Sequence, residues 1–503
     1  MLFNSFQFLV FFPTVTALYF LLPHRYRWFL LLTASCVFYM AFIPVYILIL
    51  FLTIVVDYSA GIYIEQSQGR RRKIFLYASL ISTAGILFVF KYFNFFNTNI
   101  AALAKFLDWN YSYEGLLLAL PIGLSFHTFQ SMSYVIEVYR GQQKAERHFG
   151  IYSLYVMFYP QLVAGPIERP QNLLKQFYQE HHFDYTRVAD GLKLMAWGLF
   201  KKVVIADRLA VFVDTVYNNP HAYEGVPLIM ATFFFAFQIY CDFSGYSDIA
   251  IGAAQVMGFR LMDNFNRPYF AKSITEFWKR WHISLSTWFR DYFYIPLGGN
   301  RVPVKRWYLN LFLTFLISGL WHGANWTYVV WGALNGFYLI FAIVSEDARN
   351  RFTSAIGLQK LPRFHKLLKV LSTFSLICFA WIFFRANSID DAFYIISHLF
   401  TGVGDFVWQY AQYLIAAHLK SGPKPDKSIR EVLTLGRHIS EFQIAMKVIV
   451  LLIVVQLIQR NGSLRQRIAG KPAWLRWSGY YLLVMGIILY GLEASEQFIY
   501  FQF

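Results

Sequence analysis

The chain has 503 residues, of which 57% are hydrophobic and 15% are charged, and its formal net charge is +17. Soluble domains carry about 25% charged residues, so this composition excludes an ordinary water-soluble protein and indicates that lipid covers much of the surface. A high positive charge in a soluble protein would indicate nucleic-acid binding. Here the basic residues lie in short loops between apolar runs, as in HRYR (24–27) and GRRRK (69–73). That arrangement predicts membrane lipids as partners and no nucleic acid.

Long apolar segments recur along the whole chain. Because a spanning helix needs about 20 mostly apolar residues, hydropathy predicts spans near 5–22, 28–43, 45–63, 74–92, 114–136, 190–215, 227–257, 307–321, 325–344, 366–384, 444–458 and 476–492. The segments 150–166 and 271–297 are apolar but interrupted, and we expect them to be re-entrant or interfacial. The predicted fold class is an all-α polytopic membrane protein with about eleven to thirteen membrane segments.

The first apolar segment, from Phe6 to Leu22, has no basic region before it and no small-residue cleavage site after it. We therefore expect a retained span and no secretory signal. If the N-terminus faces outward, the basic loops at 24–27 and 65–73 both fall inside. The loop at 93–113, with one Lys and one Asp, then falls outside. The positive-inside rule thus predicts an outward N-terminus.

The chain reads as one membrane domain, because no fixed-period repeat or low-complexity tract interrupts it. We expect N-terminal helices at 1–149, a core at 150–345 and C-terminal helices at 366–503. The polar stretch 402–441 predicts an extramembrane loop with short helices. The three cysteines, Cys36, Cys241 and Cys378, have neither a zinc spacing nor a disulfide framework.

Polar side chains within apolar segments concentrate between residues 120 and 335. A charged side chain at the centre of a membrane helix costs about 2.5–3.5 kcal/mol, so such residues usually face a cavity, a partner or a substrate. The candidates are His127, Glu168, the lysines of LFKKVVIADRL (199–209), and Asp242 and Asp248 in YCDFSGYSDIAIG (240–252). Ser244 in the last motif lacks the strand–turn–helix context of a serine nucleophile.

The segment FWKRWHISLSTWFRDYFYIPLGG (277–299) mixes aromatic and charged residues around His282. Rotation of one helix does not bring all these charges out of lipid, which favours an amphipathic or re-entrant segment at headgroup depth. One interpretation is an interfacial anchor. The other is a gate that binds an anionic donor through Lys279, Arg280 and Arg290.

His322 follows an apolar segment and precedes Gly323 in SGLWHGANW (318–326). An imidazole accepts a proton near neutral pH, so a histidine in a tunnel is suited to deprotonating a hydroxyl that attacks an acyl carbonyl. The alternative is a histidine that packs helices and bonds a backbone carbonyl. No pair of histidines has metal-binding spacing on one helix, so we expect no metal.

Five blocks together resemble a known family: GPIERP (165–170), FKKVVIADRLA (200–210), YCDFSGYSDIAIG (240–252), NFNRPYFAKSITEFWKRWHISLSTWFRDYFYIPLGGNR (264–301) and SGLWHGANWTYVVWGALNG (318–336). They are similar to the membrane-bound O-acyltransferase (MBOAT) family, in particular its bacterial branch that acetylates alginate, peptidoglycan and cellulose. The opening MLFNSFQFLVFFPTV and the closing FIYFQF also resemble that branch.

The resemblance implies tilted helices around a central tunnel, with the donor entering from the cytoplasm and the acceptor from outside. It also implies that His322 is catalytic and that His282 lines the donor side of the tunnel. Further substrate or donor contacts are expected from Lys279, Arg280, Arg290, Asp242 and Asn325.

The implied function is membrane O-acetylation of an exported polysaccharide, such as alginate, cellulose or peptidoglycan. The donor would be acetyl-CoA or another acetyl thioester, with no bound cofactor. A periplasmic partner with an SGNH-hydrolase-like fold is implied, and so is the bacterial cytoplasmic (inner) membrane. Two alternatives are D-alanyl transfer to teichoic acid by a related enzyme and a transporter or flippase, which would normally show inverted repeats.

Overall fold

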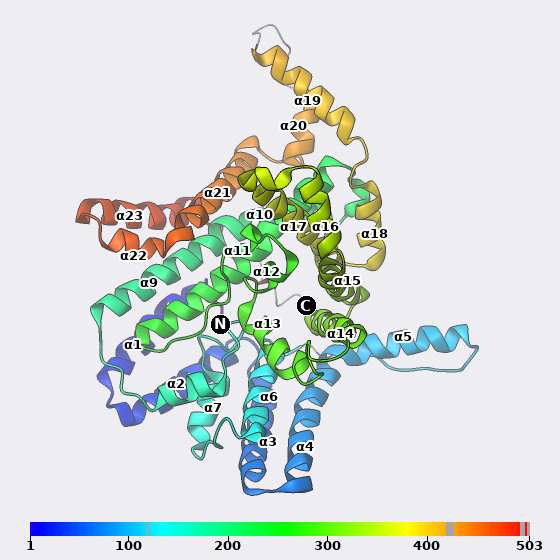
Figure 1. Ribbon diagram of the computed structural model, residues 1–503. Helices are drawn as coiled ribbons and strands as arrows, with labels where there is room; N and C mark the ends of the chain where they lie inside the picture. Colours follow the sequence, from blue (N-terminus) through cyan, green and yellow to red (C-terminus); the bar gives the residue numbers. More distant parts are fainter. Residues whose placement is uncertain (117, 119, 419–426, 493–497, 500–503) are drawn as a thin grey trace.

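The part of the chain that the structure describes is almost entirely helical. The computed structural model describes residues 1–503 apart from 117, 119, 419–426, 493–497 and 500–503. Within these residues it contains helices α1–α23, with several 3-10 and π-helical turns between them, and no strand (Figure 1). The predicted all-α class is therefore confirmed.

The N-terminal helices are held together partly by buried polar groups. Their bounds are α1 (Phe6–Leu21), α2 (His24–Met40), α3 (Ile47–Gln66), α4 (Gly69–Leu87), α5 (Phe93–Phe106), α6 (Leu124–Arg140) and α7 (Phe149–Met157). Asp57 on α3 accepts hydrogen bonds from Ser79 Oγ at 2.6 Å and Thr83 Oγ1 at 3.2 Å on α4. One turn earlier on α3, Thr53 Oγ1 lies 2.6 Å from Nε2 of the buried His127 on α6. These bonds between helices tie α3 to both of its neighbours.

The centre of the molecule is built on α11, whose apolar window is 83% buried, the largest share among the candidate spans. The elements of this region are α8 (Pro170–Phe177), α9 (Tyr185–Phe200), the π-helical turn η3 (Lys201–Ala206), α10 (Asp207–Tyr217) and α11 (Val226–Met257). Glycines bring α9 and α11 into backbone contact. A Cβ on Gly198 would lie 2.6 Å from the carbonyl oxygen of Gly245, and one on Gly191 would lie 2.8 Å from that of Gly252. Small residues permit this approach.

The next helices enclose the centre from the other side. They are α12 (Ile274–Trp278), α13 (Ile283–Phe289), the π-helical turn η6 (Arg290–Tyr294), α14 (Val304–His322), α15 (Trp326–Val344), α16 (Glu346–Ala355) and α17 (Pro362–Arg385). Here too, glycines set the distance between helices. A Cβ on Gly319 of α14 would lie 2.8 Å from Cα of Gly332 on α15.

The C-terminal part includes one helix, α19, that projects from the rest of the molecule. Its elements are α18 (Ile389–His398), α19 (Val403–His418), α20 (Lys427–Thr434), α21 (Ile439–Ile458), α22 (Leu464–Ala469) and α23 (Ala473–Tyr490). Figure 1 shows α19 extending outward, whereas α20 packs against α11 and α21. The short helices expected within 402–441 are therefore present, although residues 419–426 lie outside the described part. The chain then returns to the centre, where Phe498 and Ile499 are buried.

Among the described residues, six helical stretches are long and apolar enough to cross a membrane: Pro44–Gln66, Gly69–Phe106, Val226–Met257, Trp326–Val344, Pro362–Arg385 and Ile439–Ile458. Phe6–Leu21 is a shorter apolar helix. The other predicted spans also contain helices, but these are shorter or more polar. The chain is thus a multi-pass membrane protein in which six spans, fewer than the predicted eleven to thirteen, meet these criteria of length and hydropathy.

Several predicted spans are not continuous α-helices, and the one expected at 74–92 ends in the π-helical turn η2 (Phe88–Tyr92). The helix expected at 114–136 begins only at Leu124, because Pro121 and the left-handed Gly123 (φ 80°) precede it. The helix expected at 190–215 is interrupted by η3. The predicted interruption of 150–166 and 271–297 is confirmed: α7 ends at Met157, and the second segment is divided among α12, α13 and η6.

Candidate active site

His322 is the last residue of α14, and its side chain is surrounded by aromatic rings. The imidazole centroid lies 4.8 Å from Trp321, 5.1 Å from Trp331 and 5.2 Å from Phe384, and the residue is 6% exposed. Gly323 makes the turn that follows, where a Cβ would collide with the ring of Tyr328. The helix end and the glycine together place this imidazole inside the molecule.

The carbonyl end of α14 is bonded by residues of the π-helical turn η2 (Phe88–Tyr92). Lys91 Nζ donates to the carbonyl oxygens of Trp321 and His322, at 2.8 Å each, and Tyr92 Oη donates to that of Leu320 at 3.0 Å. The last carbonyls of a helix lack partners within the helix and carry partial negative charge. A cation there satisfies them and fixes the backbone of His322. Sequence analysis missed Lys91, although a lone lysine in the apolar run FVFKYF (88–93) was a usable signal.

His282 stands between α12 and α13 in a left-handed backbone conformation, with φ 41° and ψ 56°. It is 1% exposed, and its ring lies 4.6 Å from that of Phe243 and 6.2 Å from that of Phe126. Its Nδ1 lies 3.2 Å from Oδ1 of Asn264. This imidazole thus has a polar side chain on one edge.

The structure brings the two predicted histidines into one interior region. Phe126 packs on His282 and also lies 5.8 Å from Trp321, the neighbour of His322. The arrangement has the geometry of one aromatic-walled site with two histidines.

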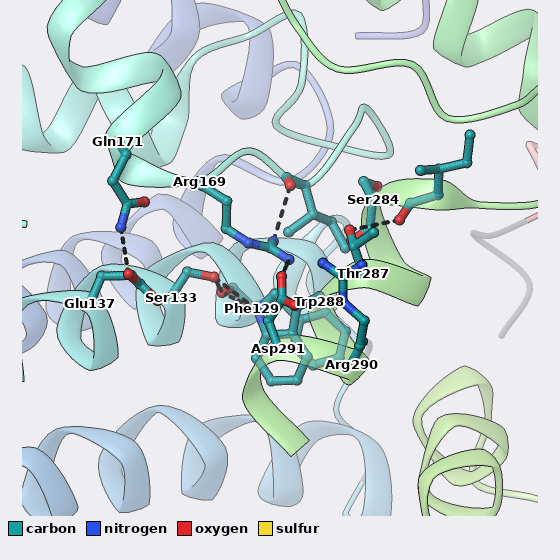
Figure 2. A network of polar contacts seen from close by, with 12 residues as sticks. Phe129, Ser133, Glu137, Arg169, Gln171, Ser284, Thr287, Trp288, Arg290 and Asp291 are labelled. Atoms are coloured by element: carbon teal, nitrogen blue, oxygen red, sulfur yellow. Dashed lines mark hydrogen bonds and ion pairs between the residues drawn. The ribbon is translucent and has the colours of Figure 1, made fainter. Parts of the chain in front are cut away.

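The three cations predicted to bind a donor, Lys279, Arg280 and Arg290, are exposed or partly exposed. Lys279 is exposed, and Arg290 is exposed and paired with Asp291 at 2.7 Å (Figure 2). Arg280 pairs with Glu276 at 2.6 Å and donates to the carbonyl of Arg267 at 3.3 Å. Their donor-binding role stays a prediction.

Asp242 and Asn325 make contacts within the fold. Asp242 pairs with Lys202 at 2.7 Å and accepts from the backbone N–H of Ile499 at 2.7 Å, which joins α11 to η3 and to the C-terminal segment. Lys202 also pairs with Asp207 at 2.8 Å. Asn325 caps α15, because its Oδ1 accepts from the N–H of Thr327 at 3.0 Å.

Glu168, in the segment after α7, fixes the loop that leads toward His282. Its carboxyl is 1% exposed and accepts from the backbone N–H of Met262 at 2.5 Å. Burial raises the pKa of Glu168 to about 7. Met262 is two residues before Asn264, so this contact supports the residue beside His282.

A cavity of about 850 Å³ lies between α9, α11, α21 and α23. Its walls are partly apolar, and three of its lining cations are Lys193, Arg267 and Arg465. It also includes Ile283, the residue after His282, and Ser244, whose Oγ accepts from Lys201 Nζ at 2.8 Å. This cavity combines cations, apolar walls and proximity to His282.

A second cleft of about 800 Å³ is lined by Arg140, Arg169, Asp291 and Tyr292. Figure 2 shows Arg169 reaching Asp291, with a separation of 3.4 Å. Both arginines lie 5.0 Å from the ring of Tyr292. The adjoining Trp288 packs 4.1 Å from Phe129, which lies 4.9 Å from Trp321, so packed aromatic rings separate this cleft from His322.

No group of three or more metal-ligating side chains was found among the described residues. The site itself combines two imidazoles in an aromatic enclosure with a neighbouring cavity that is lined in part by cations.

Comparison with known proteins agrees with the sequence motifs. The sequence model of the MBOAT, membrane-bound O-acyltransferase family, matches residues 148–387. The chain is 41% identical to the probable alginate O-acetylase AlgI of Pseudomonas aeruginosa, over 80% of this chain and 75% of that protein. It is 33% identical to the peptidoglycan O-acetyltransferase of Helicobacter pylori, over 94% and 91%, and 27% identical to the teichoic acid D-alanyltransferase of Bacillus subtilis, over 53% and 69%. The chain therefore belongs to the membrane-bound O-acyltransferase family and is a multi-pass membrane acyltransferase.

Proposed function

We propose that this enzyme moves an acetyl group from a cytoplasmic thioester, acetyl-CoA, across the membrane to a hydroxyl group of an exported polysaccharide. The observation that carries the proposal is the placement of His322 at the buried end of α14, inside an aromatic enclosure that it shares with His282. The names of two relatives support the acetyl group, since one is a probable alginate O-acetylase and the other a peptidoglycan O-acetyltransferase.

In the proposed reaction, His322 acts as the general base. It takes the proton of the acceptor hydroxyl while the hydroxyl oxygen forms a bond to the acetyl carbonyl carbon. The carbon–sulfur bond of the thioester breaks, and the departing sulfur receives the proton from the imidazolium. The rings of Trp321, Trp331 and Phe384 limit access of water, which would otherwise hydrolyse the thioester.

The 850 Å³ cavity is the proposed donor site. Lys193, Arg267 and Arg465 supply cations for the phosphates of coenzyme A, and the apolar walls suit its uncharged arm. The inner wall reaches Ile283, next to His282. In this proposal Lys279 and Arg290 stay at the surface, whereas sequence analysis placed them at the donor.

We further propose that a periplasmic protein with an SGNH-hydrolase-like fold receives the acetyl group or presents the polysaccharide. The support is the resemblance of the five sequence blocks to the acetylating branch. The bacterial sources of the relatives support residence in the bacterial cytoplasmic membrane. D-alanyl transfer is the weaker candidate, because the D-alanyltransferase match covers about half of the chain.

The decisive experiment uses purified protein in lipid vesicles with radiolabelled acetyl-CoA and a polysaccharide acceptor. We expect label in the polysaccharide with the native protein and a loss of about 10³-fold with His322→Ala. Transfer at the native rate by a membrane-inserted His322→Ala protein would refute the role of His322. Label that enters the vesicles as intact donor, with none transferred, would indicate a transporter. A requirement for a D-alanyl carrier protein would indicate the D-alanyl reaction.

A further inference from the structure

Asn264 contacts the edge of His282 that carries Nδ1, and it does so from a loop that precedes His282 by 18 residues. We propose that Asn264 is a positioning residue that fixes His282 as the neutral tautomer with its proton on Nδ1. The effect on rate that we expect rests on the proposed function, whereas the tautomer itself does not.

The contacts around Asn264 are all buried. Its Oδ1 lies 2.7 Å from Ser284 Oγ, 3.3 Å from the backbone N of Ser284 and 3.2 Å from Nδ1 of His282. Its Nδ2 donates to Ser247 Oγ on α11 at 3.2 Å. Each of these four residues is at most 1% exposed. The amide therefore joins α11, the 258–267 loop and the start of α13 at one point.

The backbone N–H of Ser284 determines which way the amide faces. A backbone N–H only donates, so the atom opposite it must be the carbonyl oxygen of Asn264. An amide rotated by half a turn would place two donors against each other and leave a buried group without a bond. The same oxygen faces Nδ1 of His282, and an oxygen acceptor requires a proton on that nitrogen. The lone pair of the neutral ring is then on Nε2.

The backbone near Asn264 fixes the same residue. The carbonyl oxygen of Asn264 accepts from the N–H of Ile283 at 2.9 Å, and the N–H of Asn266 donates to the carbonyl of Arg280 at 2.9 Å. These two bonds hold both sides of the left-handed turn at His282. A non-glycine residue in this region of φ/ψ is held there by its surroundings, and such positions concentrate at functional sites. The side-chain and backbone bonds of Asn264, together with the backbone bond of Asn266, thus set both the turn and the ring.

The chemical consequence is a defined basic atom beside the donor cavity. With the proton fixed on Nδ1, Nε2 is the only ring nitrogen of His282 able to accept a hydrogen bond or a proton. The ring is packed against Phe243 and Phe126, so its plane is fixed as well. A fixed tautomer matters because a histidine in the wrong one offers a donor where an acceptor is needed.

The direct test is solid-state NMR of protein labelled with ¹³C,¹⁵N-histidine in lipid vesicles at neutral pH. The difference between the native spectrum and that of His282→Gln assigns the signals of this one histidine among twelve. We expect a neutral ring with a protonated Nδ1. A protonated Nε2, or a charged ring, would overturn the proposal whatever the activity of the protein.

Variants then assign the effect to Asn264. Asn264→Leu keeps the approximate volume but removes the acceptor, and we expect a mixture of tautomers. Asn264→Asp restores an acceptor and should restore the Nδ1–H form. Ser284→Ala is the matched control, because it removes one hydrogen bond to the same oxygen but not the contact with His282. Unchanged tautomer in Asn264→Leu would contradict the proposal.

Kinetics provide the second readout. We expect Asn264→Leu to lower kcat by about 10- to 100-fold, as loss of an orienting partner does, with KM for acetyl-CoA within about twofold of native. Asn264→Asp should recover most of that loss, which a merely structural role would not predict. If the tautomer changes as expected while kcat stays native, Asn264 still positions the ring, but the role of His282 in the proposed function is refuted.

Discussion

The two histidines of the site are held by opposite means. His322 ends a long helix, its ring packs among those of Trp321, Trp331 and Phe384, and its backbone is fixed by Lys91. His282 sits in a strained turn between two short helices, and its ring is fixed by an amide. A residue placed by packing is sensitive to the shape and position of its helix, whereas one placed by hydrogen bonds is sensitive to single polar atoms. The comparison can be tested by changing each support separately.

The largest effect is expected from the imidazoles themselves. His322→Ala should lower acetyl transfer by about 10³-fold, because loss of a general base typically costs 10²- to 10⁴-fold. His282→Ala should cost less if His282 shapes the donor side and does not take the hydroxyl proton. Both rates are measured with labelled acetyl-CoA in vesicles, with thermal unfolding as the control for folding. Equal losses would show that the two histidines share one chemical role.

Removal of the cation behind His322 should have the next largest effect. Lys91→Met leaves the last carbonyls of α14 without their partner, and a lost bond to a charged group costs about 1.5–3 kcal/mol. We expect a loss of transfer of about 10- to 100-fold together with lower thermal stability. Lys105→Met is the matched control, since Lys105 is exposed at the end of α5. Native activity in Lys91→Met would show that the helix end does not depend on this cation.

The position of the helix that bears His322 can also be changed at Gly319, where α14 packs against α15. A Cβ at Gly319 would collide with the carbonyl oxygen of Tyr328, so Gly319→Ala should separate α14 from α15. We expect a decrease in the free energy of unfolding of about 1–3 kcal/mol, as for overpacked cores. Gly85→Ala serves as the control, because nothing lies within 4 Å of a Cβ there. Equal stability of the two variants would contradict the close contact between α14 and α15.

The smallest effect is expected at the proposed donor cavity, because several cations there would each contribute part of the binding of the phosphates. Arg267→Gln should raise KM for acetyl-CoA by about tenfold, which corresponds to one charge-assisted hydrogen bond to a phosphate. Lys279→Gln should change KM by less than about twofold, because Lys279 is exposed and does not line the cavity. A large rise in KM with Lys279→Gln and none with Arg267→Gln would instead indicate that the donor binds at the segment around Lys279, as the sequence predicted.

Helices and the histidine of SGLWHGANW were accessible to sequence analysis because both depend on local signals. Apolar runs predict α3, α11, α15, α17 and α21. An imidazole at the end of an apolar run is easily noticed, because a polar side chain in a membrane segment costs free energy. The interruption of the span expected at 190–215 was not predicted, because Lys201 and Lys202 mark polar positions there but do not indicate a π-helical turn. Pro121 and Gly123 did indicate a helix start after residue 123. The apolar run from 114 onward, however, favoured an earlier start for α6.

The supports of the two histidines were missed for a different reason. Lys91 is more than 200 residues from the carbonyls that it bonds. Asn264 is 18 residues from His282 and carries no chemistry of its own to suggest a role. Both act through tertiary contacts, which a single sequence does not display. The donor-binding role expected for Lys279, Arg280 and Arg290 rested on charge alone, and it stays a prediction.

The π-helical turns of this enzyme have a consequence for how tolerant it is of insertions and deletions. Each residue of a helix advances the direction of its side chain by about 100°, and a π-helical turn carries an extra residue that resets this phase. In η2 the reset aims Lys91 at α14, and in η3 it lets the consecutive Lys201 and Lys202 reach different aspartates. Deletion of a single codon within 88–92 would therefore restore an ordinary helix yet turn the lysine away from its target. A shorter gene would then encode a chain whose hydropathy profile is almost unaltered but in which the end of α14 has lost its contact with the lysine.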